Sequence, residues 1–241
     1  MKHDLIDSLA IIIPAYNEAE RISATITEIR KYSDADIIVI NDGSTDWTTK
    51  EAKAVGARVI ELPFNLGYGA ALQTGFKYAL EQGYLYAVQM DADGQHDPSA
   101  IETLIEPVVK GDADMTLGSR FLGGGVYKAP FARRIGIVLF SVIIRLITGR
   151  KVTDPTSGFQ SMNKRVMGFY ASDAYPTDYP DADVIIMLHR GGFTFKEVPV
   201  TMKRLTGKVS MHSGLKPFYY TFKMFLSIFV TLLRSKGEGK A

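Results

Sequence analysis

The sequence contains no cysteine and only four histidines among its 241 residues. Without thiols there is no disulfide framework, zinc–thiolate site, iron–sulfur cluster or cysteine nucleophile. Charge of one sign is not in excess either, because 28 basic and 26 acidic residues leave a net charge of +2. With 46% hydrophobic and 11% aromatic residues the chain is not disordered, and its length suits one large domain with a buried core.

A leader-like opening and a membrane-spanning run are also lacking. Met1-Lys2-His3-Asp4 leads directly into a short strand-like segment. The apolar stretch Phe218–Leu233 has 16 residues including Lys223, about 24 Å as a helix against a hydrocarbon core of ~30 Å. We therefore expect it to lie on a membrane or to pack on the domain, and we expect a cytoplasmic protein, peripheral on the inner face of the cell membrane.

Basic residues are concentrated in the second half of the chain. Residues 196–241 carry nine Lys or Arg against two acidic residues, and residues 115–153 carry seven basic residues and no acidic one. In both stretches the cations are interleaved with apolar residues, which indicates an anionic membrane surface or phosphate ligands. Solvated helix faces are the alternative. Nucleic acid is not expected as a partner, because the basic residues accompany aliphatic helices.

Short apolar runs alternate with helix-like stretches, which predicts an α/β fold with a mainly parallel sheet flanked by helices. Strands are expected at Ala10–Ile13, Asp36–Ile40, Arg58–Leu62, Tyr86–Met90, Asp114–Leu117, Phe159–Met162 and Phe193–Val200. Helices are expected at Glu18–Tyr32, Asp46–Val55, Tyr68–Gln82, Pro98–Lys110, Pro130–Thr148, Asp181–Arg190 and Leu215–Leu233. The last of these predicts a C-terminal amphipathic helical tail, so that residues 1–214 form the domain and residues 215–241 an interfacial helix and tail.

Polar or glycine-rich segments follow four consecutive predicted strands. They are Pro14–Glu18, Asn41–Asp46, Asn65–Ala71 and Asp91–Gln95. Turn chemistry explains each segment separately. The carboxyl ends of parallel strands meet at one edge of a sheet, however, and this is where such folds bind ligands. The sequence therefore predicts an active site at that edge.

The segment Asp91-Ala92-Asp93-Gly94-Gln95 carries the strongest chemical signal. Two convergent carboxylates at a strand end suit a hard divalent cation, with substrate phosphate and water as its other ligands, and Gln95 adds a neutral oxygen. The structural alternative is an Asp-Gly turn that closes a strand. His96 follows directly, and we interpret it as a loop residue near the site rather than as a ligand.

Taken together and in this order, these motifs resemble the family 2 glycosyltransferases with the GT-A fold. The chain is most similar to the branch of dolichyl-phosphate mannosyltransferases and bacterial polyprenyl-phosphate glycosyltransferases. The resemblance rests also on Ser119-Arg120-Phe121, on Asp154-Pro155-Thr156-Ser157-Gly158-Phe159 and on Glu197-Val198-Pro199-Val200 with Arg204. It implies a Rossmann-like nucleotide-sugar fold, a UDP- or GDP-sugar donor, Mg²⁺ or Mn²⁺, and a polyprenyl phosphate acceptor.

The resemblance also assigns roles to individual residues. It implies donor binding by Pro14, Tyr16, Glu18, Ile40, Asp42, Asp91, Ala92 and Asp93. It implies metal binding by Asp91, Asp93 and Gln95, and a catalytic part for Asp91, Asp93, Arg120 and Arg204. It associates Arg133, Arg134 and Ser157 with the acceptor phosphate.

The expected reaction is an inverting, in-line transfer of the sugar. A phosphate acceptor is already anionic near neutral pH, so that it needs cationic positioning rather than a strong base. If the acceptor is instead the hydroxyl of a saccharide or glycolipid, a carboxylate has to take its proton, and Asp154, Asp181 and Asp183 are the candidates. A sugar-nucleotide pyrophosphorylase is disfavoured by the acidic loop after the first strand. A nucleotide-sugar sensor or membrane scaffold without turnover is disfavoured by the presence of Asp91, Asp93 and Arg204. A second copy or a membrane protein stays open as a partner.

Overall fold

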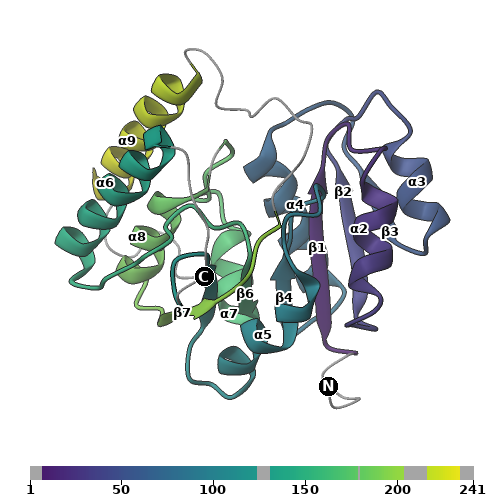
Figure 1. The fold of residues 1–241 in the computed structure, drawn as a ribbon, viewed down its shortest axis with the longest axis horizontal. Coiled ribbons are helices and arrows are strands. Elements are labelled where there is room, and N and C mark those ends of the chain that lie inside the picture. Colours follow the sequence, from purple (N-terminus) through teal and green to yellow (C-terminus); the bar gives the residue numbers. More distant parts are fainter. Residues whose placement is uncertain (1–6, 124–130, 179, 204–215, 234–241) are drawn as a thin grey trace.

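A seven-stranded sheet forms the centre of the molecule (Figure 1). The computed structural model describes residues 7–123, 131–178, 180–203 and 216–233, with side chains except for residues 131–133 and 216–221. The strand order is β3-β2-β1-β4-β6-β5-β7. All neighbouring strands are parallel except β6, which runs antiparallel to β4 and to β5. The strands are β1 Leu9–Ala15, β2 Asp36–Asn41, β3 Arg58–Glu61, β4 Tyr86–Gln89, β5 Met115–Ser119, β6 Gln160–Asn163 and β7 Phe195–Pro199.

The helices connect these strands much as the sequence predicts. They are α2 Ile22–Ile29, α3 Thr48–Ala54, α4 Tyr68–Glu81, α5 Ile101–Val109 after a short 3₁₀ turn η1 Pro98–Ala100, α6 Phe131–Thr148, α7 Lys164–Tyr170, α8 Ala182–Arg190 and α9 Lys216–Leu233. The mainly parallel α/β fold and the C-terminal helix are confirmed. Helix α7 was not expected. Helix α2 is shorter than expected, because a turn at residues 18–21 precedes it.

The two faces of the sheet bury alternate residues of the central strands. Leu9, Ile11 and Ile13 of β1 pack against α2, α3 and α5, whereas Ala10 and Ile12 face the cluster that contains α4, α7 and α8. This alternation is the period-two pattern of a strand covered on both sides. All five of these side chains are fully buried, so β1 is fixed at the centre of the molecule.

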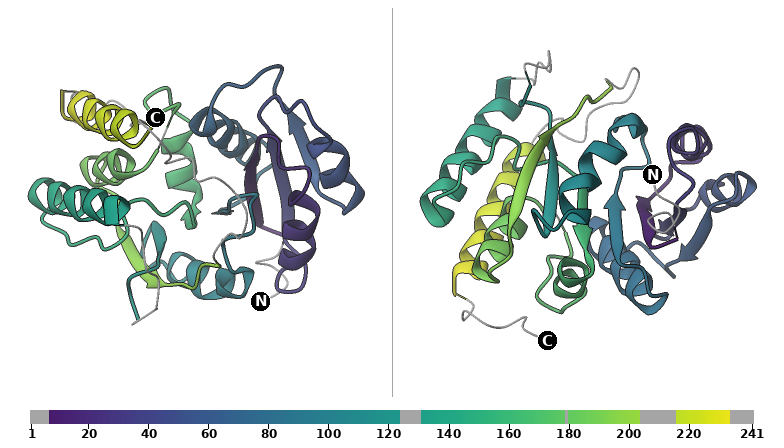
Figure 2. Two further views of the ribbon diagram at one scale, coloured as in Figure 1. Left: turned by 45° about the horizontal axis from the view of Figure 1, so that its top comes forward. Right: turned by 90° about the horizontal axis from the view of Figure 1, so that it is seen from below.

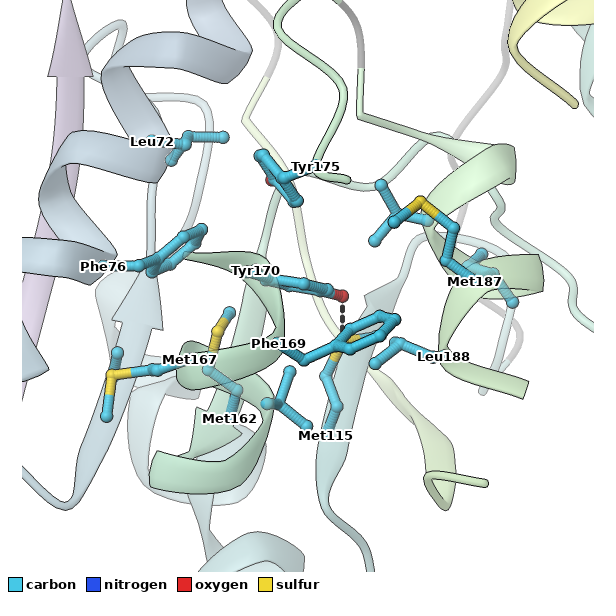
Figure 3. Packing of buried hydrophobic residues seen from close by; sticks show 14 of the residues in the cluster. Leu72, Phe76, Met115, Met162, Met167, Phe169, Tyr170, Tyr175, Met187 and Leu188 are labelled. Carbon is cyan, nitrogen blue, oxygen red and sulfur yellow. Dashed lines mark hydrogen bonds between the residues drawn. The ribbon is translucent and has the colours of Figure 1, made fainter. Parts of the chain in front are cut away.

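Aromatic and sulfur-containing side chains fill the core on the α4 side of the sheet (Figure 3). The rings of Phe76, Tyr170 and Tyr175 lie within 6 Å of one another, centroid to centroid. The Tyr170 hydroxyl contacts the Met115 sulfur at 3.0 Å. This cluster joins α4, α7 and the segment before α8 into one rigid unit.

Helices α6, α8 and α9 gather on one side of the molecule, away from α2 and α3 (Figures 1 and 2). Phe140 of α6 and Phe225 of α9 are in ring contact at 5.9 Å, and Met224 and Ile228 of α9 are buried in the main core. The expected boundary between 214 and 215 falls outside the described residues and stays a prediction. Within the described part of the chain, no helix is both long and apolar enough to cross a bilayer.

Candidate active site

The loops after β1, β2, β3 and β4 start from the same edge of the sheet. Ala15 pairs with Asn41 at the ends of β1 and β2, and Asn41 pairs with Glu61 at the end of β3. The next amides along the chain extend the same ladder, with Asp42 N–H donating to the Ala15 carbonyl at 2.9 Å. The prediction that four strand ends deliver their loops to one edge is therefore confirmed.

The loops after β1 and β2 hold each other through side-chain hydrogen bonds. Asn17, with a left-handed φ of 53°, accepts the Thr45 amide through Oδ1 at 2.9 Å, and its own amide donates to Ser44 Oγ at 2.9 Å. Asn and Asp tolerate this backbone region better than other non-glycine residues. Next to this junction, Tyr16 is 47% exposed. The two loops are thus joined beside an exposed aromatic ring, and donor binding by Tyr16 stays a prediction.

Asp42 has a structural contact that the sequence did not reveal. Its side chain is 3% exposed and accepts the backbone amides of Leu66 at 2.7 Å and Gly67 at 3.0 Å. These amides precede the first turn of α4. Asp42, assigned by resemblance to donor binding, therefore fixes the start of α4 at the site edge.

The carboxylate of Asp91 is held from two sides. Its Oδ1 accepts the Tyr68 hydroxyl at 2.8 Å, and its Oδ2 lies 3.4 Å from Nε2 of His96. Its side chain remains 31% exposed. Asp93, two residues on, accepts the Gln95 amide N–H at 3.0 Å and the Gln95 side-chain amide at 2.5 Å. The loop Asp91–Gln95 thus contains two carboxylates, and both are partly buried.

His96 lies behind this loop. Its side chain is 3% exposed, its ring stacks on Phe159 at 4.8 Å, and its Nδ1 accepts the Asp91 backbone amide at 3.1 Å. Burial lowers the pKa of His96 against the opposing effect of the Asp91 and Asp93 charges. Because Nδ1 is an acceptor in this geometry, the neutral ring carries its proton on Nε2, which faces Asp91. His96 therefore supports the loop.

The pKa of Tyr68 is raised well above its ordinary value, first by burial and then by the adjacent Asp91 charge. The phenol consequently remains a hydrogen-bond donor at neutral pH. Tyr68 lies in the segment Asn65–Ala71 that the sequence placed at this edge, but its contact with Asp91 was not predicted, because 23 positions separate the two residues in the chain.

Arg120 makes a buried ion pair with Asp154. Two guanidinium nitrogens of Arg120 each lie 2.6 Å from an Asp154 carboxylate oxygen, and the two residues are 4% and 0% exposed. The Glu197 carboxylate accepts the backbone amides of Thr153 and Asp154 at 2.8–2.9 Å. These contacts pin the segment 153–157 to β5 and β7. Asp154 is thus a buried partner of the Arg120 charge, and the catalytic part that the resemblance implies for Arg120 stays a prediction.

The other residues that the resemblance assigns to donor binding are Pro14, Glu18, Ile40 and Ala92. Pro14 and Ile40 face each other in the β1–β2 ladder, and Ile40 is fully buried. Glu18 pairs with Arg21 at 3.3 Å. Ala92 is 4% exposed and its carbonyl accepts the Thr25 hydroxyl at 2.9 Å.

The structure describes only part of the set of residues associated with the acceptor phosphate. Ser157 is 2% exposed and donates to the Gly118 carbonyl at 2.6 Å. Arg134 is exposed on α6. The side chain of Arg133 and all of Arg204 lie outside the described residues. Their roles stay predictions.

The loop chemistry fits a divalent cation that is completed by its substrate. No group of three or more His, Cys, Asp or Glu residues able to hold a metal occurs in the described part of the chain. Mg²⁺ and its analogues are commonly bound by only one or two carboxylates together with substrate phosphates. Asp91 and Asp93, with Gln95 beside them, match that arrangement.

The family model for glycosyl transferase family 2 matches residues 10–169, so this chain belongs to that family. It is 32% identical to an undecaprenyl-phosphate mannosyltransferase of Micrococcus luteus over 85% of this chain and 87% of that protein. It is 29% identical to a UDP-N-acetylglucosamine–dolichyl-phosphate N-acetylglucosaminyltransferase of Methanococcus voltae over 87% of this chain and 92% of that protein. The homologues thus include sugar transferases that act on polyprenyl phosphates.

A solved structure shares the fold. Glucosyl-3-phosphoglycerate synthase from Mycobacterium tuberculosis, crystallised with Mn²⁺ and UDP-glucose, superimposes with a TM-score of 0.69. The match covers 92% of this chain and 79% of that chain at 20% sequence identity. The GT-A-like fold expected from the sequence is therefore confirmed.

Proposed function

We propose that this protein transfers a sugar from a nucleoside diphosphate sugar to a polyprenyl phosphate at a membrane surface. The family and the acceptors named in its homologues support the reaction class. The observation that carries the acceptor is the apolar surface of α6 and α9. Of nineteen exposed large hydrophobic side chains in the described residues, five are on α6 and seven on α9.

This apolar surface is too large to be incidental. Leu146 of α6 is 80% exposed, and Leu226 and Phe229 of α9 are 50% and 58% exposed. Exposed apolar surface on two adjacent helices marks an interaction site. A polyprenyl chain remains in the bilayer, so an enzyme that uses its phosphate has to work at the lipid surface. We therefore assign α6 and α9 to peripheral membrane contact.

At the sheet edge, Asp91, Asp93 and Gln95 would hold Mg²⁺ or Mn²⁺ with the donor diphosphate. Such an ion acts as a Lewis acid that neutralises the departing diphosphate. Tyr16, whose ring is exposed beside the Asn17 junction, would contact the nucleoside. A phosphate acceptor attacks as an anion and needs no general base.

The competing acceptor, a sugar hydroxyl, requires a carboxylate base. Asp154 is bound to Arg120, and Asp183 is buried and accepts a hydrogen bond from Ser227, so neither is available. Asp181 is only partly buried, and its backbone amide donates to Asp183 Oδ1 at 3.0 Å, so it is the candidate that we test. Asp181→Asn should abolish turnover on a hydroxyl acceptor with donor binding intact. If the acceptor is a phosphate, the Asp181→Asn variant should retain turnover.

The decisive experiment combines vesicles containing undecaprenyl or dolichyl phosphate with labelled UDP- and GDP-sugars and Mn²⁺ or Mg²⁺. We expect one sugar nucleotide to yield a charged glycolipid, and we expect Asp93→Asn to lose this product. The same panel, read by thermal shift, identifies the nucleotide and the ion, because at a fixed concentration the ligand with the lowest dissociation constant stabilises the folded state most. Labelling of hydrophilic acceptors without labelling of the lipid phosphate would refute the proposal.

Membrane contact is tested separately with matched leucine variants. Leu146→Glu and Leu226→Glu should each weaken vesicle binding about tenfold or more, since burying one leucine contributes ~1.5–3 kcal/mol. Leu85 is the control, because it is 46% exposed but belongs to neither α6 nor α9. It lies just before β4, at the end of that strand away from the Asp91–Gln95 loop. Leu85→Glu should therefore bind vesicles like the wild type. Equal binding by all three variants would exclude α6 and α9 as the contact.

A further inference from the structure

Tyr68 opens helix α4 and reaches the loop after β4. Its hydroxyl donates to Asp91 Oδ1 at 2.8 Å and accepts from Nε2 of Gln89 at 3.1 Å. A phenol has one proton, and Gln89 Nε2 occupies a lone pair of the oxygen, so the proton points to Asp91. The Gln89 amide keeps this orientation even though its Oε1 accepts no hydrogen bond from the described part of the chain. The Tyr68 hydroxyl therefore donates to Asp91 on one side while it accepts from Gln89 on the other.

Gly158 lies against the same two groups. A Cβ atom at this position would lie 3.0 Å from the Tyr68 hydroxyl oxygen and 3.3 Å from each carboxylate oxygen of Asp91. A side chain at this position would therefore crowd both groups and shift them by a few tenths of an ångström. Together with His96 on the Oδ2 side, these neighbours leave the Asp91 carboxylate one orientation.

Tyr68 is itself held in place by the backbone around it. Gly69 N–H donates to the Asp178 carbonyl at 3.3 Å, and Ala70 N–H donates to the Thr177 carbonyl at 3.1 Å. A Cβ at Gly69 would lie only 2.1 Å from the Pro176 carbonyl oxygen. The first turn of α4 is thus clamped between this segment and Asp42, so the phenol has little freedom to move.

We propose that Tyr68 is a positioning residue for the cation site, which fixes the Asp91 carboxylate in the orientation that binds the ion. This inference rests on the proposed function, because the cation is the one that accompanies the nucleotide donor. Groups that orient a metal-binding carboxylate contribute to metal affinity although they do not touch the ion, typically by 10–100-fold.

The test measures Mn²⁺ binding directly, by the electron paramagnetic resonance signal of free Mn²⁺ in the presence of UDP or GDP. Tyr68→Phe should raise the Mn²⁺ dissociation constant about tenfold. Tyr170→Phe is the matched control, because it removes a buried hydroxyl that contacts Met115 rather than Asp91. The control should stay within about twofold of the wild type. Nucleotide binding without Mn²⁺ should be equal in all three proteins, which a merely structural defect would not leave unchanged.

Each outcome decides the matter. If Tyr68→Phe and Tyr170→Phe bind Mn²⁺ equally well while the wild type transfers sugar, the positioning role is wrong and the proposed function stands. If the wild type itself binds no Mn²⁺ with either nucleotide, the metal-dependent function fails, and the role of Tyr68 fails with it. Should Tyr68→Phe not fold, Gly158→Ala takes its place. It crowds the same two groups without removing a buried donor, and it should weaken Mn²⁺ binding about tenfold as well.

Discussion

Arg120 has a catalytic part by resemblance and a buried partner in the structure. Its guanidinium pairs with Asp154 in the interior, which indicates a structural contact. The informative change is Arg120→Met, which keeps most of the apolar stem and removes the charge. If the contact is structural, this variant should lose stability first and donor binding only as a consequence.

The magnitude follows from burial. Asp154 is 0% exposed, so that removing Arg120 leaves an uncompensated carboxylate in the interior. Breaking such a buried pair costs about 3–5 kcal/mol. For a domain of this size each kcal/mol corresponds to a shift of about 2–4 °C in the melting midpoint. We therefore expect a decrease of about 6–20 °C. Arg120→Met/Asp154→Asn should recover part of this loss, because it removes the orphaned charge.

The assay is thermal and urea unfolding, with donor binding measured below the transition. Arg165→Met is the control, because Arg165 pairs with Asp114 at 2.9 Å with 69% of its side chain exposed. A surface pair of this kind contributes at most about 1 kcal/mol. If Arg120→Met melts like the wild type and yet loses turnover, the guanidinium acts on the donor, and our interpretation of the ion pair is wrong.

Three further outcomes follow from other buried contacts. Ser157→Ala should cost about 0.5–1.5 kcal/mol of stability by urea unfolding, because the Ser157 hydroxyl donates to the Gly118 carbonyl. The KM for lipid phosphate should stay unchanged, and a raised KM would support a role of Ser157 at the acceptor. Gly69→Ala should destabilise by about 3 kcal/mol through the clash with Pro176, and an unchanged melting midpoint would contradict this. Burial raises the pKa of Asp183, so the folded state holds this proton more tightly than the unfolded one. The wild type should therefore lose stability relative to Asp183→Asn as the pH rises above about 4, and parallel midpoint–pH curves would exclude this effect.

Periodicity in the sequence was sufficient for most of the fold. The strands around Ile11, Val39 and Val88 are short apolar runs with turn residues at both ends, and all three lie where they were expected. Helix α7 has seven residues, as α3 does, but it starts at Lys164 directly after β6, so that no turn separates the helical pattern from the strand before it. Its only local signal is Asn163, which caps it by accepting the Val166 amide at 3.0 Å.

The site was less predictable than the fold. Motif and strand order placed Asp91 and Asp93 at the correct edge of the sheet, because the end of a strand is a local property. The partners of the polar residues at this edge are not local. Asp42 bonds to Leu66 and Gly67, and Tyr68 bonds to Asp91, so that neither contact leaves a spacing that could be recognised in the chain.

The sequence by itself determined that this chain forms an α/β sheet, that an acidic loop ends its fourth strand, and that its second half combines basic and apolar helices. These features depend on neighbours along the chain, whose side chains act through backbone periodicity. Only the tertiary structure decided which charges face one another. It buried Arg120 against Asp154 and set Tyr68 against Asp91, because the free energy of a polar group depends on the partners and the solvent around it in space.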